Sequence, residues 1–335
     1  MANAVFSPRD FKAWIIEEAT PGTSPAITSG LYQLDVDSVA FPSLSPNQVT
    51  AVRSRGGRVI HKDDFFQDNE MRAIEVSLSG TFRKDIGTVM LMQSVAGMDL
   101  NNAVADVTLS ATPTGQSGAY GDTGDGGNNK TFSLVLASPD TDDGYNIIMK
   151  GCLCTSFSIN ADMTADGGLY KFEATISSGQ NPETNNTATE DGTAFGTDLI
   201  SLSTLDSASA KLAGVTAPVI SSFGITIESP AIYTGFSSTG YHSYARGNEF
   251  TVTANSTVKY DSVTRGLYDS LNTQTSEIGS NLFIMPQGTA TNCSVSLPVG
   301  FLTDVAFNEG DAMMLDVSVQ GASDGSANIL TFDLA

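Results

Sequence analysis

The feature that most constrains the fold is a pattern of alternating apolar and polar residues that recurs in both halves of the chain. Such alternation predicts strands with one buried face, because successive side chains of a strand point to opposite sides. Each half places a long irregular stretch after its first strand and a helical stripe after its second. The alternating segments are 32–37, 74–79, 156–163 and 170–176, then 223–228, 250–255, 304–307 and 315–319.

This recurrence predicts a mainly β chain that is built twice. We expect two tandem antiparallel β-sandwich or barrel domains, each with a short flanking α-helix. The second half lacks the glycine-rich loop at 115–129 of the first half. The predicted parts are an N-terminal arm at 1–30, a first domain at 31–178, a linker at 179–217 and a second domain at 218–335.

Helix signals occur at matching places in the two halves. Asp85 can cap a helix that ends near Gly97, where a glycine suits the left-handed conformation after the last turn. In the second half, Asp261 can cap a helix with an apolar stripe at Val263, Leu267 and Leu271. A further short helix is expected in the linker, near 198–212.

The charge of the chain is strongly acidic, with 37 Asp and Glu against 16 Lys and Arg and a formal net charge of −21. Such a chain repels nucleic acid, which argues against ordinary DNA binding by neutralisation of phosphates. The charge allows DNA as a passing cargo that must not stick. It is equally typical of an acidic, soluble protein surface with no further role.

Neither the thiols nor the N-terminus indicates export. Cys152, Cys154 and Cys293 are odd in number and irregular in spacing, which favours buried thiols in a reducing cytoplasm over a disulfide framework or zinc site. The N-terminal residues lack a basic region followed by an apolar one. No segment approaches the ~20 apolar residues that a membrane span needs.

No set of side chains predicts catalysis. The segment 321–325 fits the Gly-x-Ser-x-Gly pattern of hydrolases, but it lies between strands, and both histidines, His61 and His242, precede it. The acidic run 140–143 resembles the start of a calcium loop without the glutamate that closes one. We expect turns at both places, and no catalytic residue, metal site or cofactor.

Three stretches of the chain resemble phage tail tube proteins. They are the arm from Ala13 into 30–38, the strand and helix at 75–95, and the hairpin at 151–176. The second half resembles the same pattern more faintly. The resemblance implies a tail tube protein with a duplicated tube domain. Its expected fold is a pair of packed antiparallel sheets with a flanking helix.

The resemblance also implies how the protein works. Subunits of this family form rings whose inner strands join into one barrel, and the rings stack into the hollow tail tube through which DNA passes. Because most relatives carry one domain and form rings of six, a doubled chain predicts a ring of three, with six as the alternative. The implied partners are other copies, the tape measure and tail terminator proteins, a sheath where one exists, and DNA as non-sticking cargo. The implied location is the virion tail, assembled in the host cytoplasm.

Two groups of residues are candidates for functional surfaces under this interpretation. Charged residues of the long loops would lie between stacked rings, together with the arm: Arg53, Arg55, Arg58, Asp122 and Asp125. Acidic residues on the polar faces of the strands would line the lumen, although an ordinary solvent face would look the same. They are Asp35, Asp37, Glu75, Asp162, Glu173, Glu228, Asp304 and Asp316.

Two other classes of protein fit part of the pattern. Extracellular adhesins and carbohydrate-binding modules are also acidic, rich in Gly and Thr, and built from β-sandwich repeats. The missing export signal argues against them. Another virion component, such as a decoration, baseplate or tail terminator protein, is the second alternative.

Overall fold

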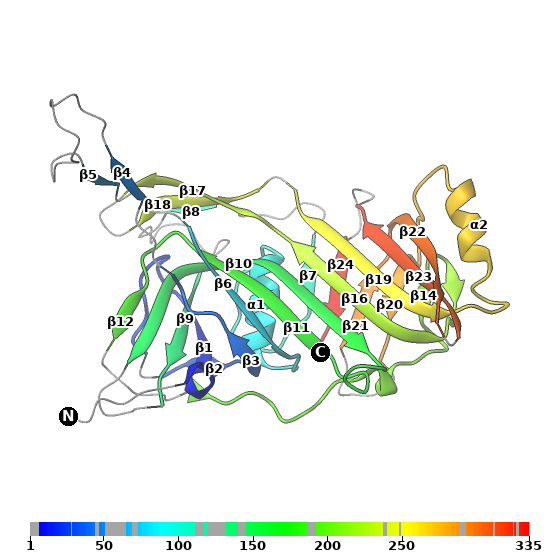
Figure 1. Cartoon of the computed structure of the whole chain (residues 1–335), viewed down its shortest axis with the longest axis horizontal. Helices are drawn as coiled ribbons and strands as arrows, with labels where there is room; N and C mark the ends of the chain where they lie inside the picture. Colours follow the sequence, from blue (N-terminus) through cyan, green and yellow to red (C-terminus); the bar gives the residue numbers. More distant parts are fainter. Residues whose placement is uncertain are drawn as a thin grey trace, which may run out of the picture.

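The structure is a computed structural model, and it confirms a mainly β fold with two α-helices among the residues that it describes. Figure 1 shows the chain as an elongated molecule in which long strands run side by side. The described residues are 7–27, 29–43, 47–50, 65–68, 73–110, 117–119, 131–139, 145–185, 192–236, 240–247, 249–287, 293–310, 312–323, 325 and 328–334.

The first part of the chain holds one α-helix and twelve strands after a short 3-10 helix at Pro8–Asp10. In chain order they are β1 (Lys12–Glu17), β2 (Leu31–Gln33), β3 (Val36–Val39), β4 (Asn47–Thr50), β5 (Phe65–Asp68), β6 (Ile74–Thr81), α1 (Ile86–Val95), β7 (Val107–Leu109), β8 (Ser117–Ala119), β9 (Phe132–Ala137), β10 (Asn146–Asp162), β11 (Lys171–Ser178) and β12 (Glu183–Asn185).

The second part holds the other α-helix and the remaining strands. They are β13 (Gly192–Thr193), a 3-10 helix (Leu202–Thr204), β14 (Lys211–Leu212), β15 (Val215–Thr216), β16 (Ile220–Glu228), β17 (Ala231–Phe236), β18 (Tyr241–Arg246), β19 (Thr251–Lys259), α2 (Gly266–Thr273), β20 (Phe283–Met285), β21 (Ser294–Leu297), β22 (Gly300–Glu309), β23 (Met313–Gly321) and β24 (Leu330–Asp333).

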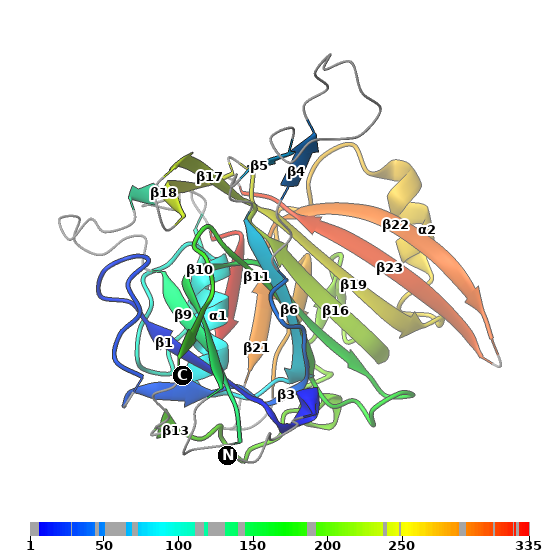
Figure 2. The same cartoon turned by 60° about the vertical axis from the view of Figure 1, so that its left-hand side comes forward.

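One large sheet, antiparallel except for the parallel pair β13–β2, joins the two halves. Eight of its strands follow one another in the order β3-β6-β11-β10-β16-β19-β23-β22, and we call these eight strands the central sheet. A six-stranded sheet, β15-β14-β20-β21-β24-β7, forms a second layer on one of its faces (Figures 1 and 2). The apolar side chains of the strands meet between the layers, so the fold is a sandwich of two packed sheets.

The two halves of the central sheet repeat the same strand order. The four strands β3-β6-β11-β10 correspond to β16-β19-β23-β22, and the last strand of the first set pairs with the first strand of the second. The pairing registers interrupt at matching places, because β3 and β16 share one irregularity and β10 and β22 share another. These irregularities lie between Val36 and Ser38, Ile220 and Ser222, Cys154 and Ser156, and Leu302 and Asp304.

Backbone hydrogen bonds at one end of the sheet repeat in the same way. The N–H of Phe82 donates to the carbonyl of Tyr170 at 2.9 Å, and the N–H of Tyr260 donates to the carbonyl of Met313 at 3.1 Å. In each half this bond joins the residue after the second strand to a residue at, or one position before, the start of the third. The repeat therefore extends to single residues, although the two halves share little sequence identity.

The core runs through both halves without a break. The ring of Tyr170 meets Phe223 edge-on at 5.1 Å between centroids, and Phe223 lies 6.1 Å from Phe283 of the second layer. All three rings are buried within one apolar cluster. Because each buried aromatic ring adds large apolar contact, these rings pack the two halves against each other through one continuous core.

Helix α1 forms where the sequence predicts it. The carboxylate of Asp85 accepts a hydrogen bond from the N–H of Thr88 at 2.8 Å, and Gly97 has a φ of 68°, which a glycine adopts without strain. Helix α2 begins at Gly266, later than the predicted cap at Asp261. The Asp261 side chain instead accepts from the N–H of Val263 at 2.8 Å, in the turn before the helix.

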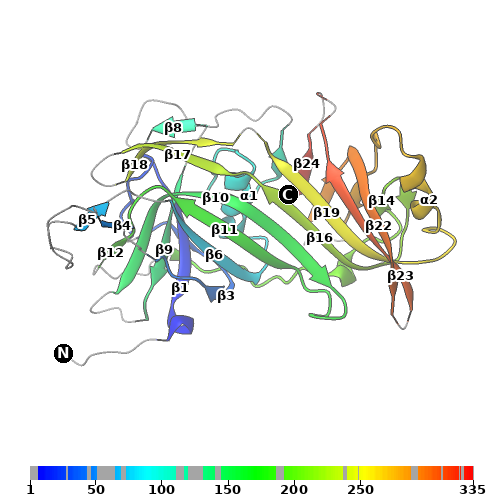
Figure 3. The same cartoon turned by 45° about the horizontal axis from the view of Figure 1, so that its top comes forward.

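Other segments differ from the sequence expectation. The predicted helix near 198–212 is only the 3-10 helix Leu202–Thr204, followed by β14. The long stretches expected to be irregular contain the strand pairs β4–β5 and β17–β18, and β8 adds a third strand to β18. Both strand pairs project at the same end of the molecule (Figures 1 and 3).

Candidate functional site

The face of the central sheet that points away from the second layer is polar, and we call it the polar face. On this face each strand presents the residues that alternate with its buried ones. Most are small and uncharged: Ser77, Ser79, Ser156, Ser158, Asn160, Thr175, Thr226, Thr253, Asn255 and Ser318. This is a continuous hydrophilic surface across both halves.

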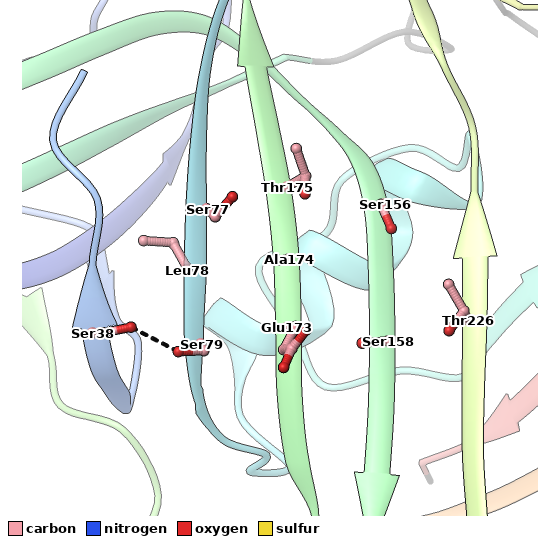
Figure 4. A pocket seen from close by; sticks show the side chains of 10 residues that line it. All are labelled: Ser38, Ser77, Leu78, Ser79, Ser156, Ser158, Glu173, Ala174, Thr175 and Thr226. Carbon is pink, nitrogen blue, oxygen red and sulfur yellow. Dashed lines mark hydrogen bonds between the residues drawn. The ribbon is translucent and has the colours of Figure 1, made fainter. Parts of the chain in front are cut away.

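A shallow hollow of about 420 Å³ lies on the polar face (Figure 4). Its lining comes from β3, β6, β11, β10 and β16, so it crosses the junction between the halves. Hydroxyl groups surround the single carboxylate of Glu173, and the hydroxyls of Ser38 and Ser79 lie 2.8 Å apart. Because small-molecule pockets are mostly apolar and concave, this open, hydroxylated surface is poorly suited to holding one small ligand.

Carboxylates outnumber amines on the polar face. By strand alternation and pairing register, it carries Glu75, Asp162, Glu173, Glu228, Asp304 and Asp316, together with Lys171 and Lys259. Four of the predicted lumen residues, Glu75, Glu173, Glu228 and Asp304, are exposed, so their charges face solvent. The polar face therefore carries a few exposed carboxylates, spaced among uncharged hydroxyl and amide side chains.

Two acidic residues of the polar face are held by local hydrogen bonds. Hydrogen bonds from the hydroxyl and the N–H of Thr164, both at 2.7 Å, lower the pKa of Asp162. The carboxylate of Asp316 accepts from the Thr257 hydroxyl at 2.7 Å and from the Asn308 side-chain amide at 3.0 Å. Both side chains therefore add negative charge to the polar face and also accept hydrogen bonds from neighbouring residues.

The remaining two predicted lumen residues lie at the β3 end of the central sheet and form ion pairs. Asp37, in β3, accepts from the Lys171 amine at 2.9 Å, and the same amine donates to the Thr81 hydroxyl. Asp35, just before β3, pairs with the Arg83 guanidinium at 2.5 Å. Ion pairing partly neutralises both carboxylates, so they contribute less negative charge than the exposed ones.

Some predicted residues lie outside the described part of the chain. They are the loop residues Arg53, Arg55, Arg58, Asp122 and Asp125, the acidic run 140–143, and His61. The Gly-x-Ser-x-Gly segment follows β23, and the Ser323 hydroxyl accepts a hydrogen bond from the Gly325 N–H at 2.9 Å. Among the described residues, no group of three or more His, Cys, Asp or Glu is placed to hold a metal ion.

The free edges of the central sheet are β3 and β22, each of which pairs with one strand only among the described residues. Beside β22, large apolar side chains are exposed, with Phe307 at 40 % and Met313 at 52 %. The Phe307 ring contacts Tyr260 and Tyr268 at centroid distances of 5.4 and 5.2 Å. This end of the sheet therefore exposes an apolar patch, and such patches often mark sites of protein–protein contact.

A buried arginine anchors the β17–β18 strand pair to the central sheet, and the sequence analysis did not single it out. The Arg246 guanidinium donates to the carbonyls of Cys154 at 2.6 Å, Ser229 at 3.0 Å and Ser94 at 2.5 Å. Ser94 lies in the last turn of α1, where the helix dipole favours a cation. A single arginine inside a strand gives no sequence signal of such a role.

A buried glutamate was also missed. Glu18 accepts hydrogen bonds from Gly22, Thr131, Ser133 and Gly151, at 2.5 to 2.9 Å. Burial raises its pKa, and the four hydrogen bonds oppose that shift without cancelling it. Its partners come from three separate segments, which sequence alternation cannot bring together.

The three thiols are buried and unpaired in disulfides. Burial raises the pKa of Cys154 and of Cys293 to about 12 and that of Cys152 well above its usual value. The thiolate is the reactive form of cysteine, so these groups are inert packing residues. None of the described helices has the length and apolar content needed to cross a membrane.

These features together indicate the class of protein to which the chain belongs. Its central sheet has an extended hydrophilic face and, among the described residues, two open edges, which are features of a structural β-sheet protein. A family model described as phage tail tube protein matches residues 12–321. The chain belongs to the phage tail tube family, and it is a structural component of the virion tail. A search of curated proteins finds no match.

Proposed function

We propose that this protein assembles with copies of itself into closed rings that stack into the hollow tail tube, and that phage DNA passes through the lumen. The observation that carries the proposal is the central sheet, which has one polar face, one packed face and two open edges. An open edge strand tends to pair with another chain. A head-to-tail contact that closes on itself removes those edges and gives a ring.

The repeated strand order supports a ring of three copies. We propose that 31–178 and 218–335 are two versions of one tube unit, joined by the linker at 179–217. Each chain then contributes two four-strand units, so three chains supply the six units that single-unit relatives draw from six chains. The junction between β10 and β16 takes the place of a contact that would otherwise join two subunits.

The polar face is proposed as the lumen wall. Its exposed carboxylates repel DNA phosphates, and its hydroxyls and amides keep the wall hydrated, so DNA has little to bind. The net charge of −21 contributes repulsion in the same direction. Asp35 and Asp37 would lie near the lumen as ion-paired residues, with the other six predicted acids on the wall itself.

The remaining parts of the proposal concern contacts outside the ring. The long loops, with Arg53, Arg55, Arg58, Asp122 and Asp125, and the N-terminal arm are proposed to contact neighbouring rings. Other copies, the tape measure protein, the tail terminator and, in a contractile tail, the sheath are the proposed partners. Assembly is proposed to take place in the host cytoplasm, where the buried thiols stay reduced.

Electron microscopy of the concentrated full-length protein tests the assembly. We expect rings or hollow tubes with a pore of a few nanometres, and native mass measurement of a single ring should give three chains of 35.0 kDa. A protein that remains a dispersed monomer at every concentration and salt would overturn the proposal. A ring of six chains would reject the three-copy arrangement alone.

Charge reversal tests the lumen. Phage carrying Glu173→Lys and Asp304→Lys should assemble normal tails and deliver DNA poorly, because both side chains are exposed on the polar face. Asp269→Lys, at an exposed position on α2, is the matched control and should deliver DNA normally. Loss of assembly in the double variant would place these residues in an interface, contrary to the proposal.

A further inference from the structure

We propose that β22 of one copy pairs antiparallel with β3 of the next copy, in the same register that β10 and β16 use inside one chain. The inference rests on the proposed ring and adds the residues and the register of its subunit contact. The partner is a second copy of this chain. The internal repeat serves as the template for the contact between chains.

The β10–β16 junction is a suitable template because each of its two strands has a counterpart at a free edge of the central sheet. Strand β22 occupies the position of β10 in the repeat, and β3 occupies the position of β16. The shared irregularities fix which residues match: Ser156 matches Asp304 in the first pair of strands, and Ser38 matches Ser222 in the second. The junction inside the chain therefore places each residue of the junction between chains.

The register between β10 and β16 is regular. Strands β10 and β16 pair from Ser156 opposite Glu228 to Asp162 opposite Ser222, without interruption. Backbone hydrogen bonds flank this ladder, from Ser229 to Thr155 at 2.8 Å and from Met163 to Ser221 at 3.0 Å. In an antiparallel ladder hydrogen-bonded pairs alternate with pairs that are not bonded.

These two flanking hydrogen bonds show which residue pairs between them are hydrogen-bonded and which are not. Ile159 opposite Ile225 falls on a hydrogen-bonded position, and Asn160 opposite Gly224 falls on a non-bonded one. Transferred to the junction between chains, Phe307 lies opposite Phe41 of the next copy at a hydrogen-bonded position. Asn308 then lies opposite Ala40 at a non-bonded position, where the two Cα atoms of a pair approach to about 4.5 Å.

The side chains at the two edges suit this register. Ile159, the counterpart of Phe307, is fully buried where β10 pairs with β16, whereas Phe307 is 40 % exposed on a strand that has no second neighbour among the described residues. Phe41 of the next copy would bring a second aromatic ring to Phe307, and Phe41 already packs edge-on against Phe11 at 5.0 Å. The contact would thus continue the apolar layer from one copy into the next.

A proline near the β3 edge is compatible with the pairing. The N–H of Ala40 donates to the Ser77 carbonyl of β6 at 3.3 Å, which shows that this residue directs its backbone groups towards β6. Pro42, two residues later, would face the same way, so its missing N–H falls on the side of β6. The donors of Val39 and Phe41 face the open edge, where the next copy would accept them.

A disulfide between engineered cysteines tests the register directly. In the full-length protein, Ala40→Cys together with Asn308→Cys places two exposed residues at a non-bonded pair, within the 4.4–6.8 Å between Cα atoms that disulfides span. Oxidised assemblies should yield, on a denaturing gel without reductant, a covalent series that ends at three chains. Reductant should return all of it to monomer. The three native thiols are buried and should not contribute.

The matched control shifts one cysteine by two residues on the same face. Ala40→Cys with Ala306→Cys uses an equally exposed position, but diagonal neighbours lie about 7–8 Å apart, beyond disulfide reach. We expect at least a tenfold lower yield of cross-linked chains. A mixture of the two single variants, Ala40→Cys and Asn308→Cys, should give covalent dimers, because the contact is head-to-tail.

The outcomes separate the register from the proposed function. Rings or tubes seen by microscopy with no cross-link, or with a stronger cross-link in the shifted control, would overturn the register and leave the tube intact. Absence of rings and tubes in both the wild type and the variants would reject the tube itself. A covalent series that ends at six chains would support the junction and reject the three-copy ring.

Discussion

Replacement of Arg246 by methionine should loosen the β17–β18 strand pair and destabilise the whole fold. Methionine keeps most of the length and the apolar stem of the side chain while removing the guanidinium. The guanidinium is buried and donates to three backbone carbonyls of different elements. The substitution therefore removes hydrogen bonds and leaves apolar packing nearly unchanged.

The size of the effect follows from those three contacts. A hydrogen bond to a charged group contributes about 1.5–3 kcal/mol, so three give roughly 4.5–9 kcal/mol before the cost of burying the charge. That cost is several kcal/mol per ion. The Ser94 carbonyl also keeps a second donor, the N–H of Gly97 at 3.1 Å. The net loss in the free energy of unfolding should be about 2–4 kcal/mol, within the usual range for a broken buried network.

Urea unfolding followed by the fluorescence of Trp14, the single tryptophan, measures the loss at a concentration where the protein is unassembled. Arg265→Met, at an exposed position before α2, is the control and should change stability by less than about 0.5 kcal/mol. Arg246→Lys should rescue little, because one amine cannot reach three carbonyls in a fork. A loss for Arg246→Met no larger than that of the control would show that the buried guanidinium does not stabilise the fold.

Three further predictions concern other buried positions. The stability advantage of the wild type over Glu18→Gln should shrink as pH rises above about 4.5, because burial raises the pKa of Glu18 in the folded state and its ionisation then costs stability. Urea unfolding across pH measures this. An advantage that grows with pH would show that the four hydrogen bonds outweigh burial. Gly80→Ala should lower the free energy of unfolding by about 1–3 kcal/mol, since an added Cβ would lie 1.9 Å from the backbone oxygen of the residue before β3. Gly279→Ala, where the added Cβ meets open space, should be neutral. Equal effects of the two substitutions in urea unfolding would contradict the clash. The folded protein should not react with a thiol reagent at pH 8, because burial raises the pKa of Cys154 and of Cys293 to about 12. After unfolding, all three thiols should react. Fast reaction of the folded protein would disprove their burial.

Local features of the fold could be predicted because they depend on neighbouring residues. Alternation identified the strands of both hairpins, and the Asp85 cap and Gly97 located α1. Asp261 did not locate the start of α2, because its side chain accepts a hydrogen bond in a turn five residues before the helix begins. A capping residue shows that N–H groups need an acceptor nearby, and turns share that need with helices.

Features that depend on distant segments could not be predicted. Alternation cannot tell which edges pair, so the β10–β16 junction and the shared core were beyond the sequence. Strand β10 is 17 residues long, so it begins well before the alternating segment 156–163, and it contains Gly151 with a φ of 61°. The same limit applies to the candidate site, since alternation found the acidic residues of the polar face and missed Arg246 and Glu18.

The junction between β10 and β16 also changes how a ring would come together. Inside one chain this contact forms by folding, at the high effective concentration that a covalent linker provides, whatever the amount of protein in the cell. A ring of three chains would then need three encounters between molecules, half the number that six separate subunits require. The cost is a loss of symmetry: α1 is buried between the layers and α2 is largely exposed, so the outer wall would repeat three times per turn although the inner wall repeats six times.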